Sequence, residues 1–163
     1  MARNKSRKVV EIFTYTTMDV LLASPIKPTP ADSRRHQLTR MWGGLASIES
    51  GPNPTADDWR VCSDAVNLME TLVRQGVVED SRGLLDDAVE ALAKAGTRAR
   101  EGHTLRLDGK GIQTVRALLE DYADLLEVLP HRTMVACHRA TERRIRAIIN
   151  GKSQPHDVEV MAL

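Results

Sequence analysis

Apolar residues of this 163-residue chain recur at spacings of three and four in five segments, and glycine or proline ends each segment. This spacing lines one face of an α-helix, whereas a half-buried strand requires alternation. In the clearest segment Trp59, Cys62, Val66 and Met69 share one stripe, and Gly76 follows as a natural helix terminator. Aromatic residues make up only 3% of the chain, so the core must be mainly aliphatic. We therefore predict an all-α bundle of four to five helices.

Residues typical of helix starts and ends indicate the bounds of the predicted helices. They cover residues 30–50, 55–75, 81–100, 112–129 and 131–150. Thr29 is expected to cap the first helix, with Pro30 in its first position. Thr55-Ala-Asp-Asp resembles a capping box for the second helix. Asp108-Gly109-Lys110-Gly111 is interpreted as a turn in which Asp108 caps the fourth helix, since it lacks the spacing of a phosphate-binding loop.

The chain divides into three parts. Residues 1–29 form a basic arm and a proline-rich lead-in, residues 30–151 the helical bundle, and residues 152–163 a tail. Residues 9–17 are rich in β-branched and aromatic side chains and form the strongest strand candidate, although residues 18–23 also fit a short helix. A strand at 157–161 would be able to pair with residues 9–15 in a minor two-stranded ribbon.

Charge is unevenly distributed along the chain. Residues 1–40 contain eight basic and three acidic residues, residues 49–92 three and ten, and residues 131–152 six and one. The net charge of +1 therefore conceals basic and acidic segments, which matter for the choice of partner.

The two cysteines and the lack of targeting signals indicate the compartment. Cys62 and Cys137 belong to no metal-ligand spacing and fall in apolar helical patterns, which favours buried thiols in a reducing compartment. No apolar segment is long enough for a signal peptide or for the roughly 20 residues that span a bilayer. We expect a cytoplasmic protein that does not enter a membrane.

No residue pattern in the chain supports catalysis, a metal or an organic cofactor. His131 and His138 lie on one helix face beside Cys137, but zinc needs three or four converging ligands. Cys137 and His138 are neighbours on a helix and point about 100° apart, which does not suit a nucleophile and its base. Neighbouring acids such as Asp57 and Asp58 are explained by helix capping. The sequence thus favours a non-enzymatic protein without cofactors.

The candidate partner-binding residues are basic. Those in the last helix are Arg132, Arg139, Arg143, Arg144 and Arg146, and those in the arm are Arg3, Lys5, Arg7 and Lys8. Arginine suits planar contacts with phosphate or carboxylate. The alternatives are a solvated helix face, or pairing with an acidic helix of the same fold. Aromatic residues that would stack on bases are missing from this helix, which argues against binding of single-stranded nucleic acid.

Several segments resemble small, mostly uncharacterised helical proteins carried by phages and prophages of proteobacteria. They are Thr55-Ala-Asp-Asp-Trp-Arg, Ala65-Val-Asn-Leu-Met-Glu, Leu107-Asp-Gly-Lys-Gly, Val115-Arg-Ala-Leu-Leu-Glu-Asp-Tyr and the arginine-rich helix with Ile145, Ile148 and Ile149. The similarity covers residues 35–149. It implies a gene in a mobile element and a protein in the cytoplasm of a bacterial host, and it supplies no catalytic motif.

Two functions follow as hypotheses. The first is a binding or regulatory protein that docks on a host or phage protein assembly, for example as an inhibitor of host machinery. The alternative is a nucleic-acid-binding protein that uses the last helix and the basic arm. A homodimer is a further expectation if Gly43 and Gly44 mark a close contact between helices.

Overall fold

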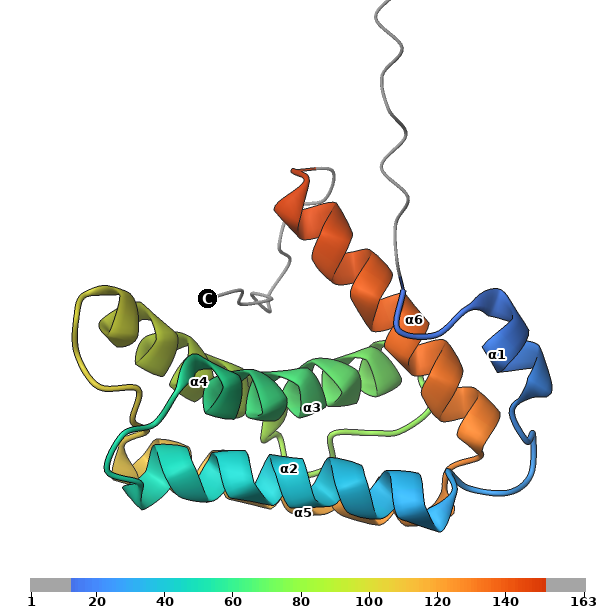
Figure 1. The fold of residues 1–163 in the computed structure, drawn as a ribbon, viewed down its shortest axis with the longest axis horizontal. Helices are drawn as coiled ribbons and strands as arrows, with labels where there is room; N and C mark the ends of the chain where they lie inside the picture. Colours follow the sequence, from blue (N-terminus) through green and yellow to red (C-terminus); the bar gives the residue numbers. More distant parts are fainter. Residues whose placement is uncertain (1–12, 152–163) are drawn as a thin grey trace, which may run out of the picture.

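The computed structural model describes residues 13–151 (Figure 1). Its regular secondary structure in this range consists of α-helices alone. The six helices are α1 Thr17–Leu22, α2 Ala31–Ser50, α3 Ala56–Arg74, α4 Leu85–Arg100, α5 Gly109–Val128 and α6 His131–Ile149. The predicted all-α bundle is confirmed. The count exceeds the predicted four to five because residues 17–22 form an additional short helix.

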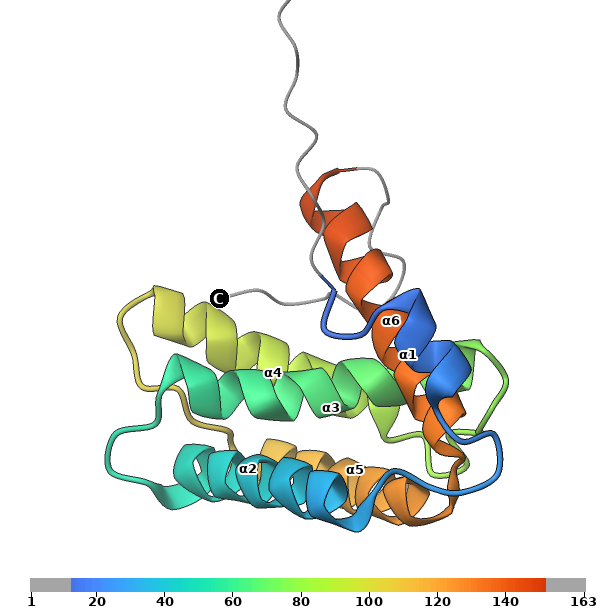
Figure 2. The same ribbon diagram turned by 45° about the vertical axis from the view of Figure 1, so that its right-hand side comes forward.

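Helices α2 to α5 form an up-and-down bundle in which consecutive helices run antiparallel (Figures 1 and 2). α2 and α5 lie side by side in one layer, and α3 and α4 lie in the other (Figure 2). α6 leaves the end of α5 and rises steeply across the end of α3, with α1 against its outer side (Figures 1 and 2). α1 and α6 thus form a unit at one end of the bundle.

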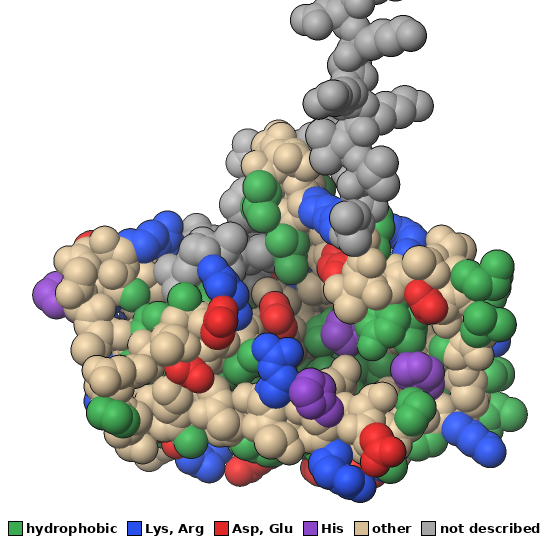
Figure 3. Space-filling view, viewed as in Figure 1, with side chains coloured by type: hydrophobic (Ala, Val, Ile, Leu, Met, Phe, Trp, Pro, Cys, Tyr) green, Lys and Arg blue, Asp and Glu red, His purple; other side chains and the backbone are tan. Residues whose placement is uncertain are grey.

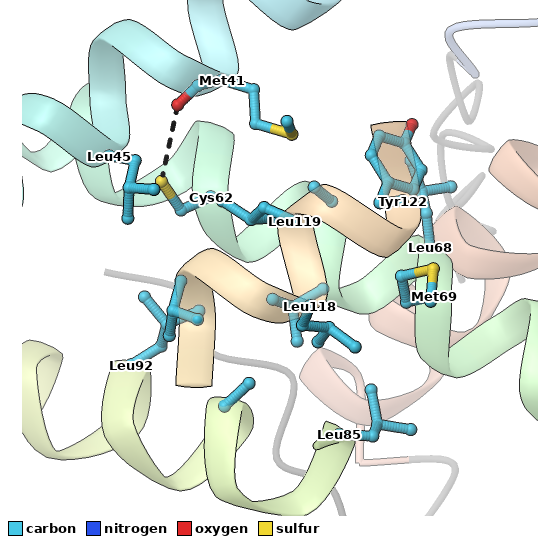
Figure 4. Close-up of a cluster of buried hydrophobic side chains, with 14 of the residues drawn as sticks. Met41, Leu45, Cys62, Leu68, Met69, Leu85, Leu92, Leu118, Leu119 and Tyr122 are labelled. Atoms are coloured by element: carbon cyan, nitrogen blue, oxygen red, sulfur yellow. Dashed lines mark hydrogen bonds between the residues drawn. The ribbon is translucent and has the colours of Figure 1, made fainter. Parts of the chain in front are cut away.

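The bundle encloses an aliphatic core, part of which Figure 4 shows. Leu45, Leu72, Leu118 and Leu119 are almost completely buried. Trp59 is also fully buried, and its indole N–H donates to the Leu92 carbonyl oxygen at 2.9 Å. Each such side chain contributes about 1.5–3 kcal/mol on burial before conformational entropy is counted. Trp59 is consequently a core residue.

Side-chain caps mark the starts of α1, α3 and α5, and three predicted starts differ from the structure, including that of α5, which begins at residue 109 rather than 112. Thr55 and Asp58 form the expected capping box of α3, and Asp108 caps α5 through the Gly111 N–H at 2.6 Å. Pro30 itself is the N-cap residue of α2, and the Thr29 hydroxyl instead lies 3.1 Å from His131 Nδ1. α4 starts at residue 85 rather than 81, because Asp80 accepts hydrogen bonds from the first amides of that helix.

Gly44 permits the close approach of α2 and α3. A Cβ atom at this position would lie 2.7 Å from the Asp58 carbonyl oxygen and closer still to the Val61 side chain. At Gly43 a Cβ atom would have no neighbour within 4 Å among the described residues. The close contact expected at this glycine pair therefore lies within the molecule, and a homodimer stays a prediction.

The predicted ribbon falls largely outside the described residues. Residues 9–12 and 157–161 are not described, and residues 13–16 precede α1 without forming a strand. Thr16 instead caps α1, because its hydroxyl accepts from the Asp19 N–H and the Asp19 carboxylate accepts from the Thr16 N–H. Within residues 13–151 no helix has the length and apolar character needed to cross a lipid bilayer.

Candidate functional site

The five arginines of α6 point in different directions, and most contact other parts of the chain. Arg144 points inward to Glu70, whose side chain is only 1% exposed. Arg74 pairs with the same carboxylate at 2.7 Å. One guanidinium N–H of Arg144 also donates to the Asn67 carbonyl oxygen at 3.2 Å. The alternative, pairing with an acidic helix of the same fold, therefore applies to Arg144.

Arg132 and Arg139 hold the segment that leads into α2. Arg132 donates to the carbonyl oxygens of Leu21 and Ala23, at 2.9 and 3.1 Å. Arg139 donates to the Tyr15 carbonyl oxygen and, at 3.1 Å, to the Thr17 hydroxyl. Hydrogen bonds from a charged donor are roughly twice as strong as neutral ones, so these arginines fasten α1 to α6.

Aromatic contacts at the start of this segment reinforce the attachment. The Phe13 ring lies 4.1 Å from the Arg146 guanidinium carbon and 5.0 Å from that of Arg139, within the range of a cation–π interaction. The Tyr15 ring packs edge-on against His138, with 5.3 Å between ring centres. The structure thus places Arg146, like Arg139, against residues that precede α1.

Arg143 is the exposed member of the arginine set. The predicted arm residues Arg3, Lys5, Arg7 and Lys8 lie outside the described part of the chain. A role for the arginines in partner binding accordingly stays a prediction. In the described residues, Arg132, Arg139, Arg144 and Arg146 all make contacts within the molecule.

The segment that covers these arginines presents an apolar face to solvent. Met18, Leu21, Leu22 and Ile26 are 59%, 62%, 78% and 83% exposed. They account for four of the seven large apolar side chains that are exposed in residues 13–151. Figure 3 shows hydrophobic side chains gathered at the edge of the molecule where α1 lies. We call these four residues the α1 apolar face.

The geometry of α1 explains this exposure. Residues 18, 21 and 22 have the spacing of one helix face, and the opposite side of α1 lies on α6. No residue of α1 is itself buried, although Ala23 directly after it is. The spacing of these residues was available in the sequence. The short helix allowed for residues 18–23 is therefore the correct alternative, although the β-branched residues at 9–17 favoured a strand.

The remaining candidate groups have structural roles. Cys62 and Cys137 are buried free thiols, and burial raises the pKa of Cys62 to about 12 and that of Cys137 to about 11, so both stay protonated at neutral pH. Asp108 and its glycines form the helix cap. Within residues 13–151, no three histidine, cysteine or acidic side chains are placed to hold a metal ion.

Comparison with known proteins finds no relative of this chain. No protein-family model, curated protein or solved structure matches the chain. The function must be inferred from the surfaces described above.

Proposed function

We propose that this protein is a non-enzymatic binding protein that docks on another protein, of a bacterial host or of a phage, through the α1 apolar face. The observation that supports this is the concentration of exposed apolar side chains between residues 18 and 26. Burying one such leucine or isoleucine contributes about 1.5–3 kcal/mol. A contiguous apolar patch on a soluble chain is typical of a protein interaction site.

The chemistry of the face indicates the complementary surface. A short helix that presents residues at positions i, i+3 and i+4 fits an apolar groove on a partner. Lys27 is exposed directly after Ile26, so an acidic rim beside that groove would complement it. We therefore expect a protein partner with an apolar groove and a negatively charged border.

The arrangement of the arginines makes nucleic acid the second candidate. Arg132 and Arg139 donate to backbone carbonyl oxygens, which carry no full negative charge. A phosphate would compete for these donors only if residues 15–23 left α6. Without that release, the exposed Arg143 and the arm residues would have to supply the phosphate contacts, so Arg143→Ala should lower the salt slope of duplex binding by about 0.9.

A pair of matched variants tests the docking face. Leu21→Gln/Leu22→Gln removes the centre of the face, and Ile149→Gln changes another exposed apolar residue, at the end of α6. The purified variants are used to capture proteins from nuclease-treated bacterial lysate, with circular dichroism to confirm the fold. We expect one protein to be captured stoichiometrically by the wild type and by Ile149→Gln, and to be lost with the double variant.

Two results would contradict the proposal. One is capture of the same proteins by all three forms, which would show that the face is not used. The other is a concentration-dependent dimer in sedimentation equilibrium that the double variant abolishes, because the face would then be covered by a second copy of the chain.

A further inference from the structure

A cleft with a volume of about 350 Å³ opens between α2, α3 and α6, away from the α1 apolar face. This volume lies at the lower end of the range for small-molecule sites. In Figure 3 histidines and side chains of both charges gather over the middle of α2, below α6. Segments that are far apart in the sequence together form the walls of the cleft.

The floor of the cleft is apolar. Met41, Ala65 and Leu68 line it and are at most 4% exposed. Tyr122 also lines the cleft, and Figure 4 shows that its hydroxyl points away from the aliphatic side chains of the core. The half-buried Val61 and Ile145 line the cleft as well, so a ligand with an apolar body would find apolar surface to cover.

Hydrogen-bond acceptors on the walls lack partners. The side-chain oxygen of Gln37 is buried and has no hydrogen-bond donor among the described residues. Buried polar atoms are almost always paired, so an orphan of this kind indicates a missing donor. Asp64 also lines the cleft; it is exposed, and within residues 13–151 it makes no ion pair within 4.0 Å. One buried oxygen without a donor and one exposed carboxylate without an ion pair therefore lie in the same cleft.

The electrostatics of the cleft agree with this excess of acceptors. Asp64 and Glu142 bring two carboxylates, while Arg40 is the one arginine or lysine along the lining. Glu142 already accepts hydrogen bonds from the Thr14 N–H at 3.1 and 3.2 Å, which leaves Asp64 as the available carboxylate. Desolvation raises the pKa of Asp64 and lowers that of His138, so the imidazole is neutral near pH 7. The lining thus contains two carboxylates and one arginine, and Arg60, outside the lining, also acts on Asp64.

We propose that this cleft binds a small organic cation, a primary ammonium group attached to an apolar body. The ammonium group donates to the Asp64 carboxylate and the Gln37 side-chain oxygen, and the apolar body lies on Met41 and Leu68. A small anion would find Arg40 opposed by two carboxylates and an orphan carbonyl oxygen. The proposal is independent of the docking function, since the two sites share no residue.

Three probes of similar shape test the charge preference on the unmodified protein. They are phenethylammonium, its neutral analogue 2-phenylethanol and the anion 3-phenylpropionate. Binding is followed by the histidine imidazole signals in two-dimensional NMR: His36 and His138 line the cleft, whereas His103 lies outside it and serves as a reference. We expect saturable shifts of the His36 and His138 signals with phenethylammonium, and binding at least about tenfold weaker with the other two.

A matched pair of variants tests the position of the ammonium group. Asp64→Asn should weaken phenethylammonium binding by about tenfold or more, because the ligand loses a charged hydrogen bond. Asp124→Asn makes the same change at an exposed position of α5 outside the cleft, and it should leave the affinity unchanged.

The probe series decides the outcome even if Asp64→Asn impairs folding. Stronger binding of 3-phenylpropionate, equal binding of all three probes, or no saturable shift at millimolar phenethylammonium would each overturn the proposal. The same holds for an equal loss of affinity in Asp64→Asn and Asp124→Asn.

Discussion

The α2–α5 bundle and the α1 segment are attached to the molecule by different chemistry. Helices α2 to α5 meet through a continuous cluster of buried aliphatic side chains around Trp59. α1 contributes no buried residue and is held by guanidinium groups of α6 and by ring contacts of the residues that precede it. Apolar burial therefore determines the bundle, and directional polar contacts determine where α1 lies.

This difference predicts unequal stability. Hydrophobic burial is the dominant favourable contribution to folding, whereas one hydrogen bond to a charged group contributes about 1.5–3 kcal/mol. Segments with few buried apolar contacts open at lower free energy than the core. α1 is thus expected to open at a lower free energy than the α2–α5 bundle.

The largest effect is expected in the bundle core. Trp59→Ala removes a fully buried indole and its hydrogen bond to Leu92, and Leu118→Ala leaves a cavity. Each should lower the free energy of unfolding by roughly 2–5 kcal/mol in urea titrations. Leu22→Ala, on the exposed face of α1, should change it by less than about 0.5 kcal/mol. If Leu22→Ala lowered the free energy of unfolding as much as the two core variants, the distinction between the bundle and α1 would be wrong.

The next effect concerns the polar link between α3 and α6. Glu70→Gln keeps the shape of the side chain but removes the charge that faces Arg144 and Arg74. Breaking a buried ion pair leaves a poorly compensated charge, so the free energy of unfolding should fall by about 2–3 kcal/mol. Glu90→Gln alters an exposed pair with Lys94 and should cost less than about 1 kcal/mol. A smaller loss at Glu70 than at Glu90 would contradict this assignment.

A smaller global effect is expected where α1 is attached. Arg139→Met removes the donors to Tyr15 and Thr17 while keeping much of the aliphatic side chain. We expect a loss of about 1–2 kcal/mol in urea unfolding. Arg143→Met, at the exposed arginine, should stay within about 0.5 kcal/mol of the wild type. If the Arg143 variant loses as much as the Arg139 variant, the distinction between anchoring and exposed arginines is wrong.

The smallest expected effect is a pH dependence. Burial lowers the pKa of His138, which packs against Tyr15. Between the native pKa and the unfolded value of about 6.5 the unfolded chain binds more protons. Stability should therefore decrease as pH falls below about 6.5, and the decrease should be shallower in His138→Gln. His103→Gln, at an exposed histidine, should retain the full slope. Identical slopes in wild type and His138→Gln would refute this contribution.

The bundle was predictable because its signals are local. Helical spacing, the Thr55 capping box and the glycine and proline breaks all act within a few residues, and they placed α3 and α6 nearly correctly. The start of α4 was missed because Asp80 reaches forward to cap it. Thr16 and Asp19 also form a readable capping box, but the neighbouring β-branched residues favoured a strand.

The site was less predictable because its contacts are distant in sequence. The carbonyl oxygens that accept hydrogen bonds from Arg132 and Arg139 belong to residues 109 to 124 positions away along the chain. The cleft likewise joins Gln37, Asp64 and Glu142 from three helices. Arginine spacing on one helix indicates which side chains share a face, but it does not show what covers that face.

Native-state hydrogen exchange compares the two regions most directly. The Ala23 amide donates to the Asp19 carbonyl oxygen at 2.9 Å and reports on α1, while amides near Val66 report on the bundle. We predict that the Ala23 amide opens at a lower free energy than the α3 amides, and that Arg139→Met accelerates its exchange while leaving α3 unchanged. Protection of Ala23 equal to that of α3, or exchange at Ala23 that Arg139→Met does not alter, would contradict the view that the α6 arginines hold α1 in place.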